Sequence, residues 1–152
     1  MCQRVPAGKW LFSRLLGRRV PYSGSISPLI VALRPGYARV ELRDRRAVRN
    51  HLDSIHAIAL ANLGEIASGL ALLCSLPAHV RGIVTHISID YLKKARGRLV
   101  AESRVTLPEV NGELQHRVQA DIRDQSGDVV AHIEVSWQLG LKTSHEDSEK
   151  PY

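Results

Sequence analysis

The stretch "IHAIALANLGEIASGLAL", residues 55–72, is almost wholly apolar and carries one carboxylate, Glu65, near its middle. Its large apolar side chains would lie around several faces of a helix, so that helix must be covered on most sides. They are Ile55, Ile58, Leu60, Leu63, Ile66, Leu70 and, just beyond the stretch, Leu73. An ionised carboxylate in such a place is costly unless it is paired or used. The stretch predicts a central helix whose one acidic residue needs a reason to be there.

The helix is expected from about Ile55 to Leu73, with Asp53 or Ser54 as its N-cap and Pro77 beyond its end. Upstream of it, "LIVALRPGYARVELRD" predicts two short strands that flank a proline-glycine turn. These strands span residues 29–34 and 37–44. One face of the second strand is apolar and the other is charged, as in a sheet that has one solvent-exposed face.

Four extended segments follow the helix, and apolar and polar residues alternate in each of them. They span residues 82–92, 98–107, 113–124 and 128–141. In the first, one side is expected to hold Ile83, Thr85, Ile87, Ile89 and Tyr91. Compact turns at Gly97, Asn111-Gly112 and Ser126-Gly127 predict that consecutive strands pair antiparallel. We therefore expect an α+β fold, with a curved antiparallel sheet of five to six strands around one helix and a second subunit completing the cover.

The 152 residues fit a single domain. We expect residues 1–24 to form a basic helix and loop that pack on this domain, residues 25–142 to form the domain, and residues 143–152 to form a flexible tail. The first 22 residues hold five basic and no acidic side chains. A transit peptide or an interfacial helix are alternatives, but a short amphipathic helix packed on the domain is the preferred interpretation. Its apolar residues would be Trp10, Leu11, Phe12, Leu15 and Leu16.

A net charge of +6 favours an anionic partner. Aromatic residues make up only 5% of the chain, which argues against a nucleic-acid partner that stacks bases. Polar residues interrupt the apolar run, so no membrane span is expected. Two cysteines without paired spacing indicate neither a disulfide framework nor a metal site, and they favour the cytoplasm. We expect no metal or cofactor.

The order of the elements, together with the start of the helix in "NHLDSIHAIALANLGE", resembles the hotdog fold of the phenylacetate-pathway type of acyl-CoA thioesterases. Their motif places an Asn six residues before a His, then small residues, then an acid nine residues after the His. Asn50, His56, Ala57 and Glu65 stand at this spacing. The segments "LFSRLLGRRVPYSGSISP" and "LRPGYARVELRDRRAVRNHL" also resemble a hotdog branch described as tetrameric acyl-CoA thioesterase. The resemblance covers the chain apart from its tail.

This resemblance implies a thioester hydrolase whose site is built between subunits, with Glu65 supplied by the facing subunit as general base or nucleophile. Hydrolysis also needs a group that stabilises the developing negative charge on the carbonyl oxygen, and helix N-termini offer unpaired N–H groups. The backbone N–H of Ala57 and the side chain of Asn50 are the candidates. His56 is expected near the substrate. A homodimer is expected, with pairing of dimers into a tetramer.

A basic cluster supplies candidate ligands for the phosphates of an acyl-CoA substrate. It consists of Lys93, Lys94, Arg96 and Arg98, and the first three are predicted to bind substrate. The alternative is the solvated end of a hairpin. A related alternative for the whole protein is a module that binds acyl-CoA or fatty-acyl groups without catalysis, because a hotdog dimer can hold the ligand without completing the chemistry.

Departures from the motif bear on the rate. Ala57 and Ile58 replace a glycine pair of many relatives, and their side chains narrow the approach to the start of the helix. Val84 stands where some related thioesterases carry a Ser or Thr that assists the water, with Thr85 expected to face the other way. The sequence thus predicts the fold, with an activity that these changes are expected to weaken or abolish.

Overall fold

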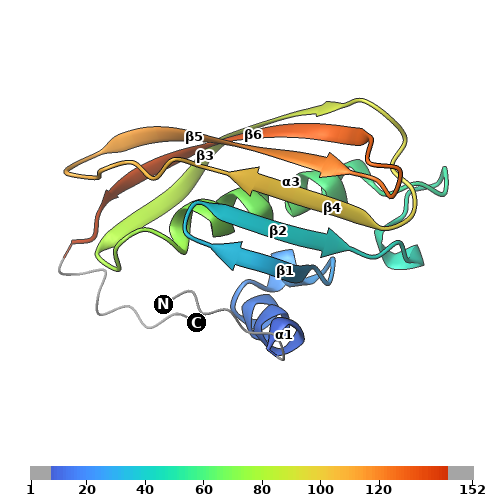
Figure 1. The fold of residues 1–152 in the computed structure, drawn as a ribbon, viewed down its shortest axis with the longest axis horizontal. Helices are drawn as coiled ribbons and strands as arrows, with labels where there is room; N and C mark the ends of the chain where they lie inside the picture. Colours follow the sequence, from blue (N-terminus) through green and yellow to red (C-terminus); the bar gives the residue numbers. More distant parts are fainter. Residues whose placement is uncertain (1–7, 144–152) are drawn as a thin grey trace.

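The computed structural model describes residues 8–143 and shows six antiparallel strands curved around one long helix (Figure 1). The helices are α1 (Lys9–Arg19), α2 (Pro21–Gly24) and α3 (Ala57–Leu73), with a 3-10 turn at Arg46–Val48. The strands are β1 (Leu29–Arg34), β2 (Tyr37–Leu42), β3 (Val80–Tyr91), β4 (Leu99–Arg104), β5 (Leu114–Arg123) and β6 (Val129–Leu141). The expected α+β class and the wrapped helix are confirmed.

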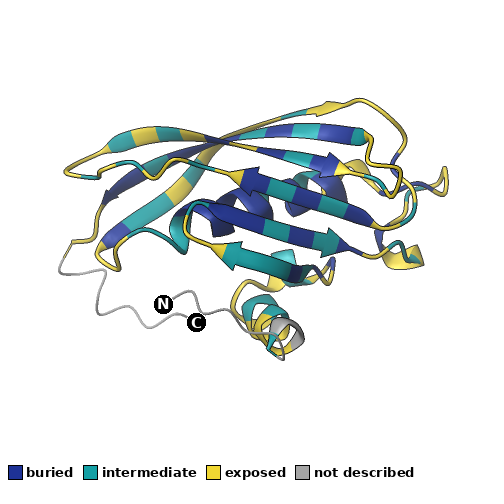
Figure 2. Cartoon of the chain, viewed as in Figure 1, coloured by how far each residue is buried: buried dark blue, intermediate teal, exposed yellow. Residues whose placement is uncertain are grey.

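The core lies between α3 and the concave face of the sheet, and in Figure 2 α3 is dark blue along most of its length. Twelve of its 17 residues are buried, among them Leu63, Ala67 and Leu72, which are not exposed at all. Each buried leucine contributes about 1.5–3 kcal/mol relative to an exposed one. The apolar run is thus explained by burial, as its pattern predicts.

The sheet order is β1-β2-β4-β5-β6-β3, which differs from the expected succession of hairpins at one place. β3 and β4 do not pair, because β3 pairs with β6 and β4 pairs with β2. The segment between them instead packs on the loop before α3: Ile55 N–H donates to the Ala95 carbonyl and Gly97 N–H donates to Asp44. Gly97 has a φ of 72°, which favours glycine as the predicted turn requires, but this turn lies in a crossover between two strands that do not pair.

A β-bulge lies in β3 between Val84 and His86 and changes which side chains face the helix. Val84 pairs with Trp137 and Ile87 with Val135, and both partners are buried. Simple alternation puts Ile83 on the same side as Ile87, and that expectation is wrong because the extra residue, Thr85, shifts the register. Val84 faces the helix, whereas Ile83 is 60% exposed.

The N-terminal segment packs at the β1 edge of the sheet, with α1 below β1 in Figure 1. The Ser13 hydroxyl accepts a hydrogen bond from Ile30 N–H. Residues 1–7 and 144–152 lie outside the described residues, and with them most of the predicted tail. None of the described helices is long and apolar enough to cross a bilayer.

Candidate functional site

The loop before α3 is shaped by Asn50. Its Oδ1 accepts hydrogen bonds from the N–H groups of Leu52 and Ser54, at 2.9 and 3.2 Å, and from the Ser54 hydroxyl. This is the Asx-type turn that places a side-chain oxygen on backbone two residues ahead. Asp53 takes a left-handed φ of 51° in this turn. The Oδ1 atom of Asn50 therefore orders the loop. The Nδ2 group of the same amide is the part that could bind a ligand.

Helix α3 begins two residues later than the sequence predicts, and its N-cap is His56, in place of Asp53 or Ser54. The polar atoms of Ser54 are already bonded to Asn50, and Ile55 lies in a β-bridge with Arg49. The Nδ1 atom of His56 accepts from Ile58 N–H at 3.1 Å, so the second ring nitrogen of a neutral imidazole carries the proton. His56 is therefore a helix cap as well as an exposed residue beside the site.

The first peptide groups of α3 are held at both ends. Tyr91, at the end of β3, donates its hydroxyl to the Ala57 carbonyl at 2.9 Å, while His56 binds the N–H of the same peptide unit. Ala57 is exposed, and its own N–H has no hydrogen-bond partner among residues 8–143. Sequence reasoning missed Tyr91 as a site residue, since 34 residues separate it from Ala57 and nothing in the strand pattern pairs them.

Glu65 lies on the side of α3 that the sheet leaves uncovered. Residues three, four and seven apart share a helix face, and here that face carries Ile58, Ala61 and Glu65. Ile58 is 54% exposed and Ala61 is partly exposed. On the helix-facing side of β3, Ile87 and Tyr91 are 41% and 48% exposed. The result is an apolar strip with one carboxylate, which we call the α3–β3 strip.

The carboxyl of Glu65 is half-buried, and burial raises its pKa above the ordinary value. A methyl group on Gly69 would lie 4.0 Å from Oε1 of Glu65 and 3.2 Å from the ring of Trp137, so apolar atoms adjoin the carboxylate. Across the described part of the chain, the carboxyl of Glu65 forms no ion pair and accepts no hydrogen bond, whereas its backbone carbonyl accepts one from the Ser68 hydroxyl. An acid without a partner in apolar surroundings is a frequent sign of a functional group.

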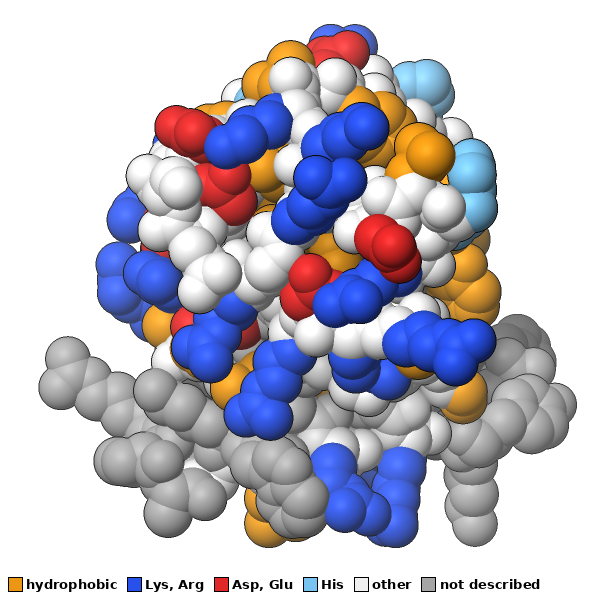
Figure 3. Space-filling model, turned by 90° about the vertical axis from the view of Figure 1, so that its right-hand side faces the viewer, with side chains coloured by type: hydrophobic (Ala, Val, Ile, Leu, Met, Phe, Trp, Pro, Cys, Tyr) orange, Lys and Arg blue, Asp and Glu red, His pale blue; other side chains and the backbone are white. Residues whose placement is uncertain are grey.

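The basic cluster lies on the loop between β3 and β4, at the end of the molecule where α3 begins. Lys93 is held between Asp124 and Asp128, at 2.6 and 2.8 Å, and these hydrogen bonds raise its pKa. Arg96 donates to the Leu52 carbonyl at 3.3 Å, whereas Lys94 is exposed. Figure 3 shows Lys and Arg side chains gathered over this end. This loop is thus a cationic surface that is anchored beside the start of α3. It is not the end of a hairpin, because β3 and β4 do not pair.

Two surface hollows lie elsewhere and contain none of the predicted residues. One, of about 270 Å³, is lined by Glu102, Arg104, Gln119, Ala120, Asp121, Arg123 and His132. It includes a His132–Asp121 pair at 2.7 Å on the outer face of the sheet, since the neighbouring Ile122 and Ile133 point to the core. Within residues 8–143 no group of three His, Cys, Asp or Glu side chains could hold a metal ion.

Comparison with known proteins connects this geometry to a family. Residues 8–139 match a family model described as a domain of unknown function, DUF4442. No curated protein matches the sequence.

Solved structures share the fold along nearly the whole chain. A structural-genomics protein designated APC5556 is 34% identical, with a TM-score of 0.79 over 90% of this chain and 92% of that one. PA5026 of Pseudomonas aeruginosa, described as a probable thioesterase, is 23% identical, with a TM-score of 0.79 over 92% and 99%. The thioesterase HI1161 of Haemophilus influenzae is 15% identical, with a TM-score of 0.71 over 82% and 86%. The chain therefore belongs to the DUF4442 family and has the hotdog fold of thioesterase-family structures.

Proposed function

We propose that the protein is an acyl-CoA thioesterase whose two sites lie between the subunits of a homodimer. The observation that carries the proposal is the half-buried carboxyl of Glu65, which has no partner within residues 8–143 and whose pKa is raised by burial. In this role the carboxylate takes a proton from the water that attacks the thioester carbon, the C–S bond breaks, and CoA leaves as the thiol. If the carboxylate itself attacks, CoA leaves first and water then hydrolyses the acyl anhydride formed on Glu65. Ala57 N–H and the Asn50 amide bind the carbonyl oxygen, on which negative charge develops.

Helix geometry argues that one chain does not supply both groups to one substrate. Ala57 and Glu65 are eight residues apart on α3, or about 12 Å along the helix axis. The base and the oxyanion donor must each lie about 3 Å from the reacting group. A second copy of α3, antiparallel to the first across a two-fold axis, brings Glu65 of the partner subunit opposite Ala57.

The edge of the sheet offers a way to build that dimer. β3 is a 12-residue edge strand, hydrogen-bonded on one side to β6, and it adjoins the α3–β3 strip. A long edge with exposed apolar neighbours is a template for pairing with another copy. Antiparallel pairing of two β3 strands covers the strip on both subunits, which explains the exposure of Ile58, Ile87 and Tyr91 in one chain.

We place the phosphates of CoA on the loop between β3 and β4. Lys94 and Arg96 are the proposed ligands, and Lys93 contributes by fixing the loop through Asp124 and Asp128. The finer placement in the tetrameric acyl-CoA thioesterase branch, the pairing of dimers and the cytoplasmic location belong to the same proposal. The sequence resemblance supports the branch and the pairing of dimers, and the low cysteine content of the chain supports the location.

The test is hydrolysis of a panel of acyl-CoAs by the wild type and by Glu65→Gln. We expect turnover by the wild type and a loss of about 10²–10⁴-fold in kcat for the variant. Lys94→Gln with Arg96→Gln should raise KM and leave kcat nearly unchanged. Saturable acyl-CoA binding without turnover by the wild type would instead identify the non-catalytic binding module.

A mixing experiment tests whether the site is shared. Ala57→Pro removes only the N–H, because proline is tolerated at the first helical position and His56 already has the extended φ of −62° and ψ of 139° that a following proline requires. Alone, Ala57→Pro and Glu65→Gln should each be inactive. After subunit exchange, half of the dimers contain one intact site, so activity should return to about a quarter of the wild type. No recovery would place both groups of a site in one subunit.

A further inference from the structure

The outer face of α1 is apolar and basic, and neither the core nor the proposed dimer uses it. Leu11, Arg14, Leu15 and Arg18 share this face, since residues three, four and seven apart align on a helix. Leu11 is 56% exposed, Leu15 is 50% exposed, and Phe12 beside them is 40% exposed. This differs from the expectation that these apolar residues pack on the domain.

The inner face of α1 explains why three of its large residues, Leu11, Phe12 and Leu15, stay about half exposed. Ser13, Leu16 and Gly17 form that face, and Gly17 approaches α2 so closely that a Cβ on Gly24 would lie 2.6 Å from its carbonyl oxygen. The small residues Ser13, Gly17 and Gly24 at the contact let α1 pack closely against β1 and α2. This packing leaves about half of the Leu11, Phe12 and Leu15 side chains exposed.

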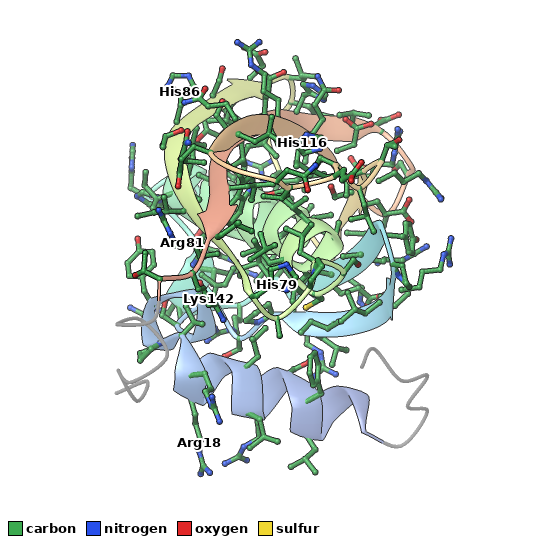
Figure 4. The ribbon with its side chains drawn as sticks, turned by 90° about the vertical axis from the view of Figure 1, so that its left-hand side faces the viewer. Arg18, His79, Arg81, His86, His116 and Lys142 are labelled. Carbon is green, nitrogen blue, oxygen red and sulfur yellow. The ribbon has the colours of Figure 1, made fainter. Side chains whose placement is uncertain are left out.

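The charged residues of α1 itself are all basic. Arg18 and Arg19 end the helix, and Figure 4 shows Arg18 pointing away from the sheet. The chain has no acidic residue before Glu41. Val20 and Tyr22, which follow the helix, are 44% and 68% exposed and extend the apolar surface. Exposed apolar side chains with arginines alongside match the two layers of a lipid surface, acyl chains below anionic headgroups.

We propose that α1 is an interfacial helix that holds the protein on anionic membrane surfaces. Its 11 residues span about 16 Å, half the hydrocarbon thickness, so the helix lies in the plane of the surface and does not cross it. Leu11, Phe12 and Leu15 enter the interface, and Arg18 and Arg19 contact lipid phosphates. The sheet order puts α1 at the β1 edge and the dimer at the β3 edge, so both helices of a dimer remain available.

A second copy of the chain fits this face less well than a lipid surface. Two α1 helices packed on each other, parallel or antiparallel, would bring only like charges together, because every charged residue of α1 is basic. Like charges in contact oppose association, whereas an anionic surface attracts each arginine by about 1 kcal/mol.

The experiment is flotation of the full chain with vesicles of phosphatidylcholine, with and without phosphatidylserine. We expect binding only to the anionic vesicles, weakened by added salt. Arg18→Gln with Arg19→Gln should lower the partition coefficient about 25-fold, from about 1 kcal/mol for each charge. Leu11→Gln with Leu15→Gln should lower it to a similar degree, about 25-fold, because half of each side chain is already buried in the free protein.

Matched controls remove the same groups from other surfaces. Arg43→Gln with Arg46→Gln, and Ile83→Gln with Leu107→Gln, change exposed residues outside α1 and should bind vesicles as the wild type does. No binding by the wild type, or an equal loss in the controls, overturns the proposal. So does a fall in molecular mass for Leu11→Gln with Leu15→Gln in sedimentation equilibrium, since a second copy would then be what covers α1.

Discussion

At the residue scale, the Glu65 carboxyl links activity with stability through its protonation. Burial raises the pKa of this group, so over a range of pH the folded chain holds a proton that the unfolded chain has lost. Stability from this group is full below the unfolded pKa and is lost as the pH rises through the folded pKa. A general base must be ionised, so activity rises through the same range in which stability falls.

Glu65→Gln should therefore be more stable than the wild type at neutral pH. The amide carries no charge to desolvate, whereas below about pH 4 the wild-type carboxyl is also neutral and the difference should vanish. Thermal unfolding of both proteins between acid and neutral pH measures this. A difference in Tm that does not change with pH would show that the charge of Glu65 costs nothing in the fold.

The hydroxyl of Tyr91 should matter for the rate more than for binding. Tyr91→Phe keeps the ring and removes the hydrogen bond to the Ala57 carbonyl, which loosens the peptide units that present the Ala57 N–H. A net hydrogen bond of about 1 kcal/mol corresponds to a fall of about 5-fold in kcat, with KM nearly unchanged. Steady-state kinetics on the best acyl-CoA tests this. Tyr22→Phe, on an exposed tyrosine whose hydroxyl forms no hydrogen bond within residues 8–143, is the control, and equal kcat for both variants would remove Tyr91 from the mechanism.

At the element scale, α3 lies close to β6 because it carries glycine where the two approach. A Cβ on Gly64 would lie 2.5 Å from Cγ2 and 3.2 Å from Cβ of Ile133, and a side chain branched at Cβ cannot move aside there. A Cβ on Gly69 would meet the Trp137 ring at the more tolerable 3.2 Å. At Gly64 there is therefore no room for a side chain between α3 and β6.

Gly64→Ala should consequently lower the free energy of unfolding by about 1–3 kcal/mol, despite alanine's higher helix propensity. Gly69→Ala is the matched control on the same helix and should change it less. Urea denaturation of the two variants and the wild type gives the comparison. If Gly64→Ala were as stable as Gly69→Ala, the close approach would not limit the packing of α3.

At the scale of the whole molecule, the β3 edge and the α3–β3 strip predict a dimer. Ile87→Lys places a charge on the strip, where the partner subunit would bury it, and should halve the mass measured by sedimentation equilibrium at low concentration. Turnover should fall in parallel, because each site needs two chains. Leu107→Lys, 37% exposed in the wild type and outside the strip, is the control. A monomeric wild type would exclude the shared site.

The sequence by itself determined the central helix, the six strands and the residue that most needs explanation. Apolar periodicity is a local property, so α3 and the strands follow from it within a few residues. Glu65 stood out because burying an ionised carboxylate in an apolar helix costs free energy wherever that helix lies in the fold. The resemblance of the Asn50, His56 and Glu65 spacing added the hotdog fold, which the structure and its neighbours confirm.

Only the tertiary structure decided how these parts meet. β3 leaves β4 and pairs with β6, His56 caps α3 in place of Asp53 or Ser54, and Tyr91 reaches Ala57. The physical reason is competition between partners that are distant in sequence. Ser54 could cap the helix only if it were not already bonded to Asn50. Lys93 could bind a phosphate directly only if Asp124 and Asp128 did not hold it. A local sequence pattern does not show which of these partners lies close enough to bind.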